Sequence, residues 1–275
     1  MKDQTEPLHR IADALERLAP PAPARTDWLA APAYVWDGQA ARAVARIDAP
    51  PLELLQGIDR QKKAATDNVL RHAAGFAAHD MLLWGARGTG KSALVRSAVQ
   101  AAAAAHPGRI ALVQVTADGV ERLSALFNEF DGIDRRFAIF IDDLGFAAED
   151  TVGPRHLRSW LDGGVEARPA NVRLAVTSNR RAILHRDAAE QDDPINPRDA
   201  VDDQLALADR FGLALGFHAL GQDDYLAILR GYATAHGLAL DEHEALEWSK
   251  RRGARSGRVA WHYITELAGR AGQQL

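Results

Sequence analysis

The chain has 275 residues, of which 47% are hydrophobic, so it can bury one substantial core or a core with a small satellite domain. It has no cysteine, which excludes disulfides and thiolate metal sites, and its ten histidines form no H-x-x-x-H pair that would indicate structural zinc. The net charge of −4 gives no overall electrostatic reason to bind nucleic acid. No apolar run approaches the roughly 20 residues of a membrane span, and the first residues lack the order of a signal peptide. We therefore expect a cytoplasmic protein without a membrane partner.

Residues 1–51 are expected to lie outside the core. Their first apolar residues recur at helical spacing: Leu8, Ile11, Leu15 and Leu18. This spacing predicts an amphipathic helix that ends at the proline-rich segment 20–23. The helix can dock on the body of the protein or on another subunit, or it can belong to a disordered leader, and the sequence leaves these alternatives open. No period emerges between residues 28 and 51, so an irregular lead-in is expected there.

Strands and helices alternate between residues 52 and 220. A helix is expected to follow residues 57–59 and to run to about residue 78. After it the pattern predicts five short apolar strands: Met81–Trp84, Ile110–Val115, Phe137–Ile141, Val172–Thr177 and Phe211–Phe217. Helices are expected between them at about 93–105, 120–130, 156–163 and 201–208. Short apolar strands separated by helices favour an α/β core, with a five-stranded parallel sheet covered by helices on both faces.

Beyond residue 220 the pattern predicts helices alone, at about 223–235, 242–250 and 258–269. A small all-helical domain over residues 221–275 is therefore expected to follow the core. It carries a basic stripe: Lys250, Arg251, Arg252, Arg255 and Arg258. A solvated helix face is the favoured interpretation of this stripe, and a local nucleic-acid site is the alternative.

A complete phosphate-loop motif, G-x-x-x-x-G-K-S, stands between the first core strand and its helix. Its residues are Gly85, Ala86, Arg87, Gly88, Thr89, Gly90, Lys91 and Ser92. The glycines let backbone N–H groups wrap the phosphates, Lys91 reaches the β and γ oxygens, and the Ser92 hydroxyl can ligate Mg²⁺. The sequence therefore predicts a nucleoside triphosphate site that also takes Mg²⁺.

Polar residues follow two of the later strands. Asp142 and Asp143 come directly after the strand 137–141, as in a Walker B element. There Asp142 would hold Mg²⁺ and Asp143 would orient the attacking water, although acidic residues also cap helices. Asn179 closes the next strand, and a parallel sheet delivers it to the same edge. Its amide can hold the lytic water or the γ-phosphate, or it can serve the geometry of a turn.

Two arginines lie far along the chain from the phosphate loop. Arg210 precedes the fifth strand and would suit catalysis in trans, inserted by a neighbouring subunit, while the alternative is a surface ion pair with Asp209. Arg258 opens the last helix, from which it can reach back to the γ-phosphate. By position alone, an exposed residue at a helix start is an equal alternative.

Together these motifs resemble the AAA+ ATPase superfamily over about residues 52–267. Five segments further resemble a bacterial family known as domain of unknown function 815: 57–62, 83–92, 161–166, 177–181 and 208–212. The superfamily resemblance implies a role for each candidate site residue: Lys91 and Ser92 as Walker A, Asp142 and Asp143 as Walker B, Asn179 as sensor 1, Arg210 as arginine finger and Arg258 as sensor 2. It also implies ATP as the nucleotide.

The resemblance implies an ATP-hydrolysing module that assembles as a homo-oligomer and remodels an unidentified protein or DNA partner. Two departures qualify this expectation: Asp143 stands where ring ATPases usually have Glu, and no pore loop of the aromatic-Val-Gly type occurs. The main alternative is a nucleotide-gated scaffold, or a DNA-associated switch like a helicase loader, with little hydrolysis. A small-molecule kinase is a third and less favoured hypothesis.

Overall fold

The computed structural model describes residues 5–18, 25–144, 161, 168–179 and 209–275. Apart from Leu161, the helices expected at 156–163 and 201–208 lie outside these residues. No helix among the described residues is long and apolar enough to cross a membrane.

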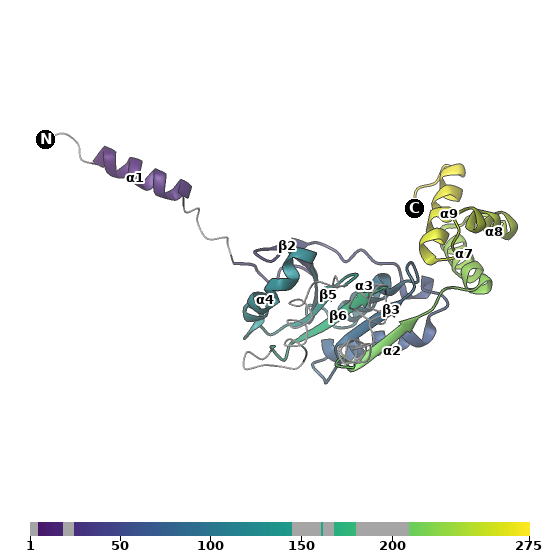
Figure 1. Ribbon diagram of the computed structural model, residues 1–275, viewed down its shortest axis with the longest axis horizontal. Helices are drawn as coiled ribbons and strands as arrows, with labels where there is room; N and C mark the ends of the chain where they lie inside the picture. Colours follow the sequence, from purple (N-terminus) through teal and green to yellow (C-terminus); the bar gives the residue numbers. More distant parts are fainter. Residues whose placement is uncertain (1–4, 19–24, 145–160, 162–167, 180–208) are drawn as a thin grey trace, which may run out of the picture.

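A seven-stranded sheet lies at the centre of the described chain, in the order β2-β1-β4-β5-β6-β3-β7 (Figure 1). The strands are β1 (Ala33–Trp36), β2 (Ala41–Val44), β3 (Met81–Gly85), β4 (Ile110–Val115), β5 (Arg136–Ile141), β6 (Val172–Ser178) and β7 (Leu213–Phe217). Only the pairing of β1 with β2 is antiparallel among these described strands. The five strands predicted for the core are therefore confirmed as β3 to β7.

The expectation of an irregular lead-in over residues 28–51 is wrong for residues 33–44, which add two strands to the sheet. β1 pairs in parallel with β4, and β2 pairs with β1. Three of the four residues of β1 are buried, so its side chains show no alternation that a sequence pattern could reveal. The lead-in is also tied to the core, because the buried guanidinium of Arg135 donates to the carbonyl oxygen of Trp28 (2.6 Å).

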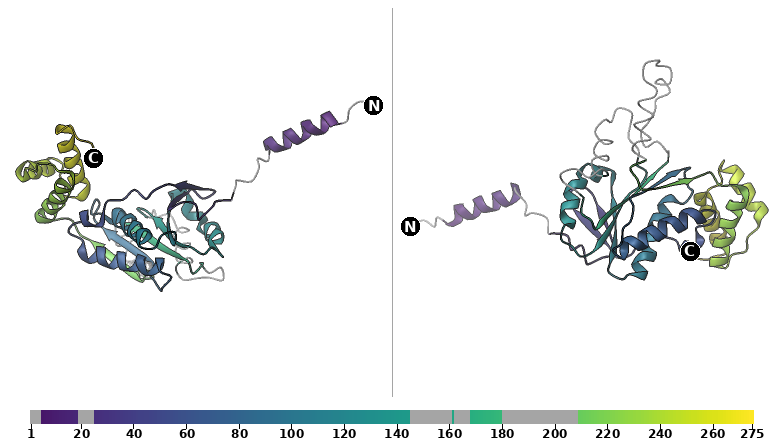
Figure 2. Two further views of the ribbon diagram at one scale, coloured as in Figure 1. Left: turned by 180° about the vertical axis from the view of Figure 1, so that it is seen from behind. Right: turned by 90° about the horizontal axis from the view of Figure 1, so that it is seen from below.

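Helices cover both faces of the sheet. α2 (Asp59–Ala73) and α3 (Lys91–Ala105) share one apolar cluster with alternate residues of the strands, while α4 (Leu123–Phe130) packs into the cluster on the other face. Figure 2 shows the blue helices α2 and α3 along one side of the sheet. α2 ends earlier than expected because Gly75 takes a left-handed conformation (φ 87°) and closes the helix. Two 3-10 helices, η1 (Leu52–Leu54) and η2 (Ala117–Arg122), complete this part of the fold.

Three helices beyond the sheet form a lid, as predicted: α7 (Gln222–His236), α8 (Glu242–Arg251) and α9 (Gly257–Arg270). They pack around an apolar cluster of their own, which includes the fully buried Tyr225 and Tyr263. Figure 1 shows the lid at one end of the sheet. The helix α1 (Thr5–Leu18) also forms as predicted and lies clear of the rest in Figure 1, with Ile11 and Leu15 exposed.

Candidate functional site

The phosphate-loop residues form a tight turn between β3 and α3, as their glycines require. Gly85, Gly88 and Gly90 all have positive φ, at 128°, 73° and 95°. A Cβ at Gly85 would lie 1.9 Å from the carbonyl oxygen of Phe217 on the adjacent β7, so only glycine fits there. The turn leads into the amino end of α3, where free backbone N–H groups and the helix dipole favour an anion.

Lys91 is buried at the start of α3. Its Nζ donates to the carbonyl oxygens of Gly85 (2.8 Å) and Ala86 (2.7 Å) and to Oδ1 of Asn179 (3.3 Å). Burial lowers the pKa of the Lys91 ammonium, and the nearby carboxylates of Asp143 and Asp142 counter this effect. The cation therefore lies inside the loop, where phosphate oxygens of a nucleotide would take over the role of the carbonyls.

Asp142 lies at the carboxyl end of β5, beside the phosphate loop. Its Oδ1 accepts hydrogen bonds from the hydroxyls of Ser92 and Thr177, each at 2.6 Å. Carboxylate and hydroxyl oxygens are the hard donors that Mg²⁺ takes together with phosphate oxygens. Among the residues that the structure describes, no three His, Cys, Asp or Glu side chains gather to hold a metal. The donor set thus fits an Mg²⁺ that arrives with a nucleotide.

Asp143 and Asn179 contact each other at the same edge of the sheet. The Asn179 amide donates to Oδ1 of Asp143, and Nη2 of Arg87 lies 4.0 Å from the other carboxylate oxygen. The Arg87 pair is exposed and contributes little to stability. As predicted for a parallel sheet, the side chains of Lys91, Ser92, Asp142, Asp143 and Asn179 come together.

Thr177 is the site residue that the sequence reasoning missed. It is buried, and its hydroxyl accepts from the backbone N–H of Asp143 (2.8 Å) while it donates to Asp142. One side chain therefore contacts both the carboxylate of Asp142 and the backbone of Asp143. The only signal in the sequence is a hydroxyl near the end of an otherwise apolar strand.

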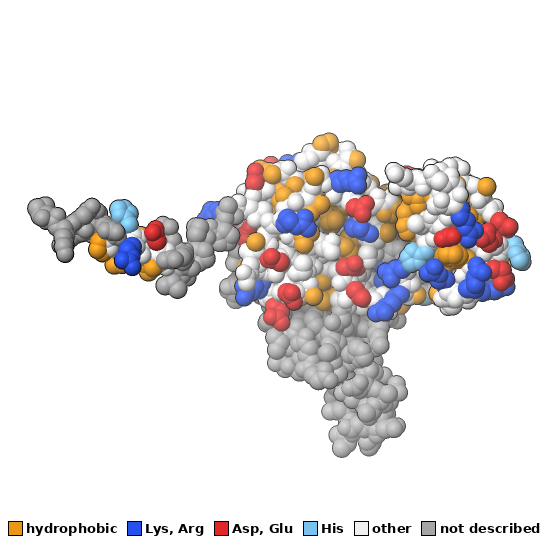
Figure 3. Space-filling model, turned by 90° about the horizontal axis from the view of Figure 1, so that it is seen from above, with side chains coloured by type: hydrophobic (Ala, Val, Ile, Leu, Met, Phe, Trp, Pro, Cys, Tyr) orange, Lys and Arg blue, Asp and Glu red, His pale blue; other side chains and the backbone are white. Residues whose placement is uncertain are grey.

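A cavity of about 620 Å³ lies between the phosphate loop and the lid. Among the described residues that line it there is no acidic side chain, and there are four cations: Arg87, Lys250, Arg255 and Arg258. Figure 3 shows Lys and Arg side chains gathered where the lid meets the core. Three members of the basic stripe thus line a cavity, and their interpretation as a merely solvated face is incomplete.

The lid contacts the phosphate loop directly. The backbone N–H of Gly257, at the start of α9, donates to the carbonyl oxygen of Gly88 (2.8 Å). A Cβ at Gly88 would lie 2.9 Å from Cβ and Oγ of Ser256 and 3.6 Å from Cβ of Arg258. The structure therefore brings Arg258 beside the phosphate loop.

Arg210 lies at the amino ends of the parallel strands, opposite to the carboxyl ends where the phosphate loop lies. β7 runs parallel to β3, with Phe217 beside Gly85 and Leu213 beside Met81. Arg210 precedes Leu213, so it lies at the amino edge, whereas the phosphate loop follows the carboxyl edge. The structure does not bring Arg210 to the nucleotide site of its own chain.

The chain has the AAA+ fold of P-loop nucleotide-binding proteins. The features that define it are the order of the parallel strands, the phosphate loop after β3, the carboxylates after β5, the amide after β6 and the helical lid. A family model described as "Protein of unknown function (DUF815)" matches residues 29–271, and the chain belongs to this family.

Solved structures with the same fold include two DNA-related proteins. The Holliday junction branch migration motor RuvB of Thermotoga maritima is 16% identical with a TM-score of 0.53, over 83% of this chain and 68% of that one. The ORC1 protein of Aeropyrum pernix, solved in complex with DNA, is 17% identical with a TM-score of 0.52, over 80% and 65% of the two chains. At these identities the likeness shows the fold alone. No curated protein sequence matches the chain.

Proposed function

We propose that this protein binds ATP with Mg²⁺ between the phosphate loop and the lid, and hydrolyses it where two copies of the chain meet. The observation that carries the proposal is the convergence of Lys91, Ser92, Asp142, Asp143 and Asn179 beside a cavity whose lining includes four cations. A cavity lined by four cations suits a polyphosphate, because each cation lowers the energy of the bound negative charge.

The position of each residue in the site indicates its proposed role. Lys91 and the backbone of the loop bind the phosphates, while Ser92 and Asp142 hold the metal. The metal held by Ser92 and Asp142 would neutralise part of the phosphate charge. Asp143 and Asn179 hold the attacking water, with the Asp143 carboxylate accepting its proton.

Two arginines complete the proposed site. Arg258 reaches the γ-phosphate from the lid of the same chain, because it already lies beside Gly88. Arg210 enters from a neighbouring copy, since its own phosphate loop lies at the other edge of the sheet. An inserted arginine stabilises the charge of the transition state and is worth about 10³ to 10⁵ in rate.

The energy of hydrolysis would remodel a macromolecular partner, and DNA is the favoured class. Of two proteins with this fold, one is a Holliday junction branch migration motor and the other was solved in complex with DNA. The second candidate is a nucleotide-gated switch with little hydrolysis. It is favoured by the short side chain of Asp143, whose carboxylate already contacts Asn179 and Arg87.

The test measures binding of a fluorescent ATP analogue and ATP turnover, with and without DNA. Lys91→Ala should abolish binding, whereas Arg210→Ala should keep binding and lose turnover by about 10³-fold or more. Lys63→Ala and Arg109→Ala, which remove exposed ion-paired cations, are the matched controls. Parental turnover in Arg210→Ala would overturn the assignment of Arg210 to catalysis in trans. If the unmodified protein binds the ATP analogue but does not hydrolyse ATP, the nucleotide-gated switch is favoured.

A further inference from the structure

The turn that carries Arg210 is held at the three positions that follow it. The ring of Phe211 is buried in the core cluster. Gly212 packs so closely on the His79 ring that a Cβ there would lie 2.3 Å from Nδ1. The backbone N–H of Leu213 donates to the carbonyl oxygen of Asp80 (3.2 Å). Two of these three contacts are made by the short segment 78–80, which leads into β3.

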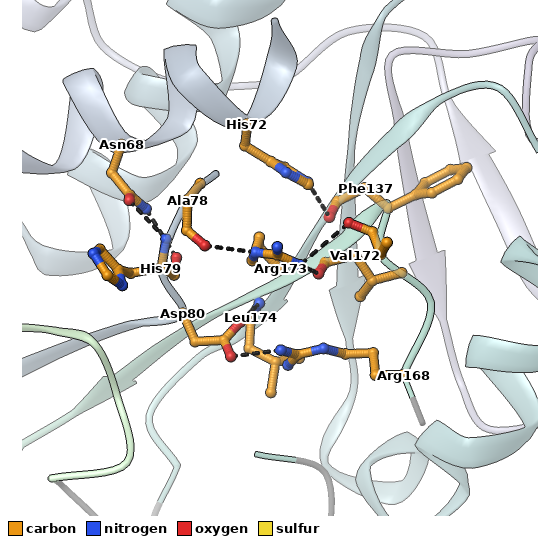
Figure 4. A network of polar contacts seen from close by, with 11 residues as sticks. Asn68, His72, Ala78, His79, Asp80, Phe137, Arg168, Val172, Arg173 and Leu174 are labelled. Carbon is orange, nitrogen blue, oxygen red and sulfur yellow. Dashed lines mark hydrogen bonds and ion pairs between the residues drawn. The ribbon is translucent and has the colours of Figure 1, made fainter. Parts of the chain in front are cut away.

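The segment 78–80 is itself fastened by buried and half-buried polar groups, which Figure 4 shows. The Asn68 side chain of α2 donates to the carbonyl oxygen of His79 and accepts from its N–H, each at 2.9 Å. Arg173 donates to the carbonyl oxygen of Ala78 (2.7 Å), and the Asp80 carboxylate accepts from the backbone of β6 (2.7 Å). The segment therefore forms a fixed platform under the Arg210 turn.

Asn68 is the residue on which this platform most depends. Its side chain is almost completely buried, with 2% of its surface exposed. A primary amide can donate to the carbonyl oxygen of a residue and accept from its N–H at the same time, as the backbone of a neighbouring strand does. Replacing it by an apolar residue leaves both backbone groups of His79 without a partner, which favours a shift of the segment.

We infer that Asn68 is a positioning residue for catalysis in trans: through His79 and Gly212 it fixes where Arg210 meets the nucleotide of a neighbouring copy. This inference rests on the proposed function. Asn68 and the platform lie at the amino edge of β3, away from the phosphate loop of their own chain. A displacement of about 1 Å in a reacting group can cost about 100-fold in rate.

The experiment mixes subunits with complementary defects. Asn68→Ala should bind the ATP analogue with parental affinity and hydrolyse ATP about 10- to 100-fold more slowly. Adding Lys91→Ala subunits should restore turnover, because they bring a well-placed Arg210 to the intact nucleotide sites of the Asn68→Ala subunits. A general folding defect would not be rescued in this way.

Two controls separate this inference from the function on which it rests. Asn171→Ala removes another amide at the amino ends of the strands. The Asn171 amide donates to three backbone carbonyls at 3.0 Å, and none of them belongs to the Arg210 turn. The Asn171→Ala variant should therefore keep the parental turnover. Arg210→Ala mixed with Lys91→Ala should also recover turnover. If that mixture recovers and the Asn68→Ala mixture does not, the positioning role of Asn68 is wrong; if neither recovers, the proposed catalysis in trans is wrong.

A second set of variants moves the turn without touching Asn68. Gly212→Ala drives a Cβ into the His79 ring and should show the same loss of turnover and the same rescue by Lys91→Ala subunits. His79→Ala keeps both backbone hydrogen bonds to Asn68 but removes the ring that contacts Gly212, so its turnover should fall less than that of Asn68→Ala. The double variant should regain turnover, because the ring that Gly212→Ala meets is gone. Parental turnover in Gly212→Ala would contradict the inference.

Discussion

The hydroxyl of Thr177 donates a 2.6 Å hydrogen bond to the oxygen of Asp142 that also accepts from Ser92. The same hydroxyl accepts from the N–H of Asp143 at 2.8 Å. One buried residue at the end of β6 thus contacts the carboxylate of Asp142 and the backbone of Asp143, the two residues that follow β5.

Thr177→Val should therefore impair turnover more than nucleotide binding. Valine keeps the shape of threonine but leaves the Asp143 N–H unpaired and removes one of the two hydroxyls that donate to the Asp142 carboxylate. We therefore expect turnover to fall by about 10- to 100-fold and more Mg²⁺ to be needed. The lost hydrogen bonds should also lower the free energy of unfolding by about 1–3 kcal/mol. Titration of ATP turnover with Mg²⁺ measures the first effect. Thr177→Ser, which keeps the hydroxyl, should stay near the parental values, and an unchanged Thr177→Val would contradict this account.

The contact between the lid and the phosphate loop is tested by two glycines with the same backbone conformation. Gly88 and Gly108 both have φ 73°, but a Cβ at Gly108 meets nothing within 4 Å, whereas one at Gly88 meets Ser256 at 2.9 Å. Each change to alanine should cost about 1–2 kcal/mol of stability through the left-handed backbone. Only Gly88→Ala should also move the lid and weaken ATP binding. Equal ATP affinity of the two variants, measured by titration with a fluorescent analogue, would show that the lid contact does not matter for binding.

Most of the α/β core could be predicted from the sequence, because its strands are short apolar runs separated by amphipathic helices. β1 and β2 could not, since β1 shows no alternation and its pairing with β4 joins segments far apart in the sequence. The early end of α2 depends on a single residue, Gly75, in a left-handed conformation.

The phosphate loop and the convergence of Lys91, Asp142 and Asn179 could also be predicted, because a parallel sheet brings the ends of its strands to one edge. The role of Thr177 could not, since a strand-end hydroxyl has many uses. The clamp of Asn68 on His79 depends on how α2 packs against the start of β3, which no local pattern encodes.

Acid should destabilise the protein through His72. This side chain of α2 is buried against the amino end of β5. Its Nε2 donates to the carbonyl oxygen of Phe137 (3.2 Å), as Figure 4 shows. The pKa of His72 is lowered from 6.5 to about 4, and burial is the largest cause. Between these values the unfolded chain binds more protons than the folded chain, so the stability present above pH 6.5 is lost as the pH falls toward 4. The loss amounts to about 3 kcal/mol.

The pH dependence is measured by chemical denaturation of the protein and of His72→Gln over this range. The variant cannot take up the proton, so its stability should fall less toward low pH. His262→Gln, which replaces an exposed histidine of α9, is the matched control and should keep the acid loss of the parental protein. The same acid loss in His72→Gln would assign the effect to another group.

The backbone of Asp143 explains why this position carries aspartate where ring ATPases usually have glutamate. Asp143 is the non-glycine residue with a positive φ (53°) among those the structure describes. Aspartate and asparagine tolerate this left-handed conformation better than longer side chains, because their short polar groups hydrogen-bond locally. Asp143→Glu should therefore lower the free energy of unfolding by about 1 kcal/mol and fail to raise turnover, despite its longer reach. Asp143→Asn should keep the fold and ATP binding but lose turnover, because an amide cannot accept the proton of the attacking water. Faster hydrolysis by Asp143→Glu at parental stability would mean that the conformation of this residue does not limit the reaction.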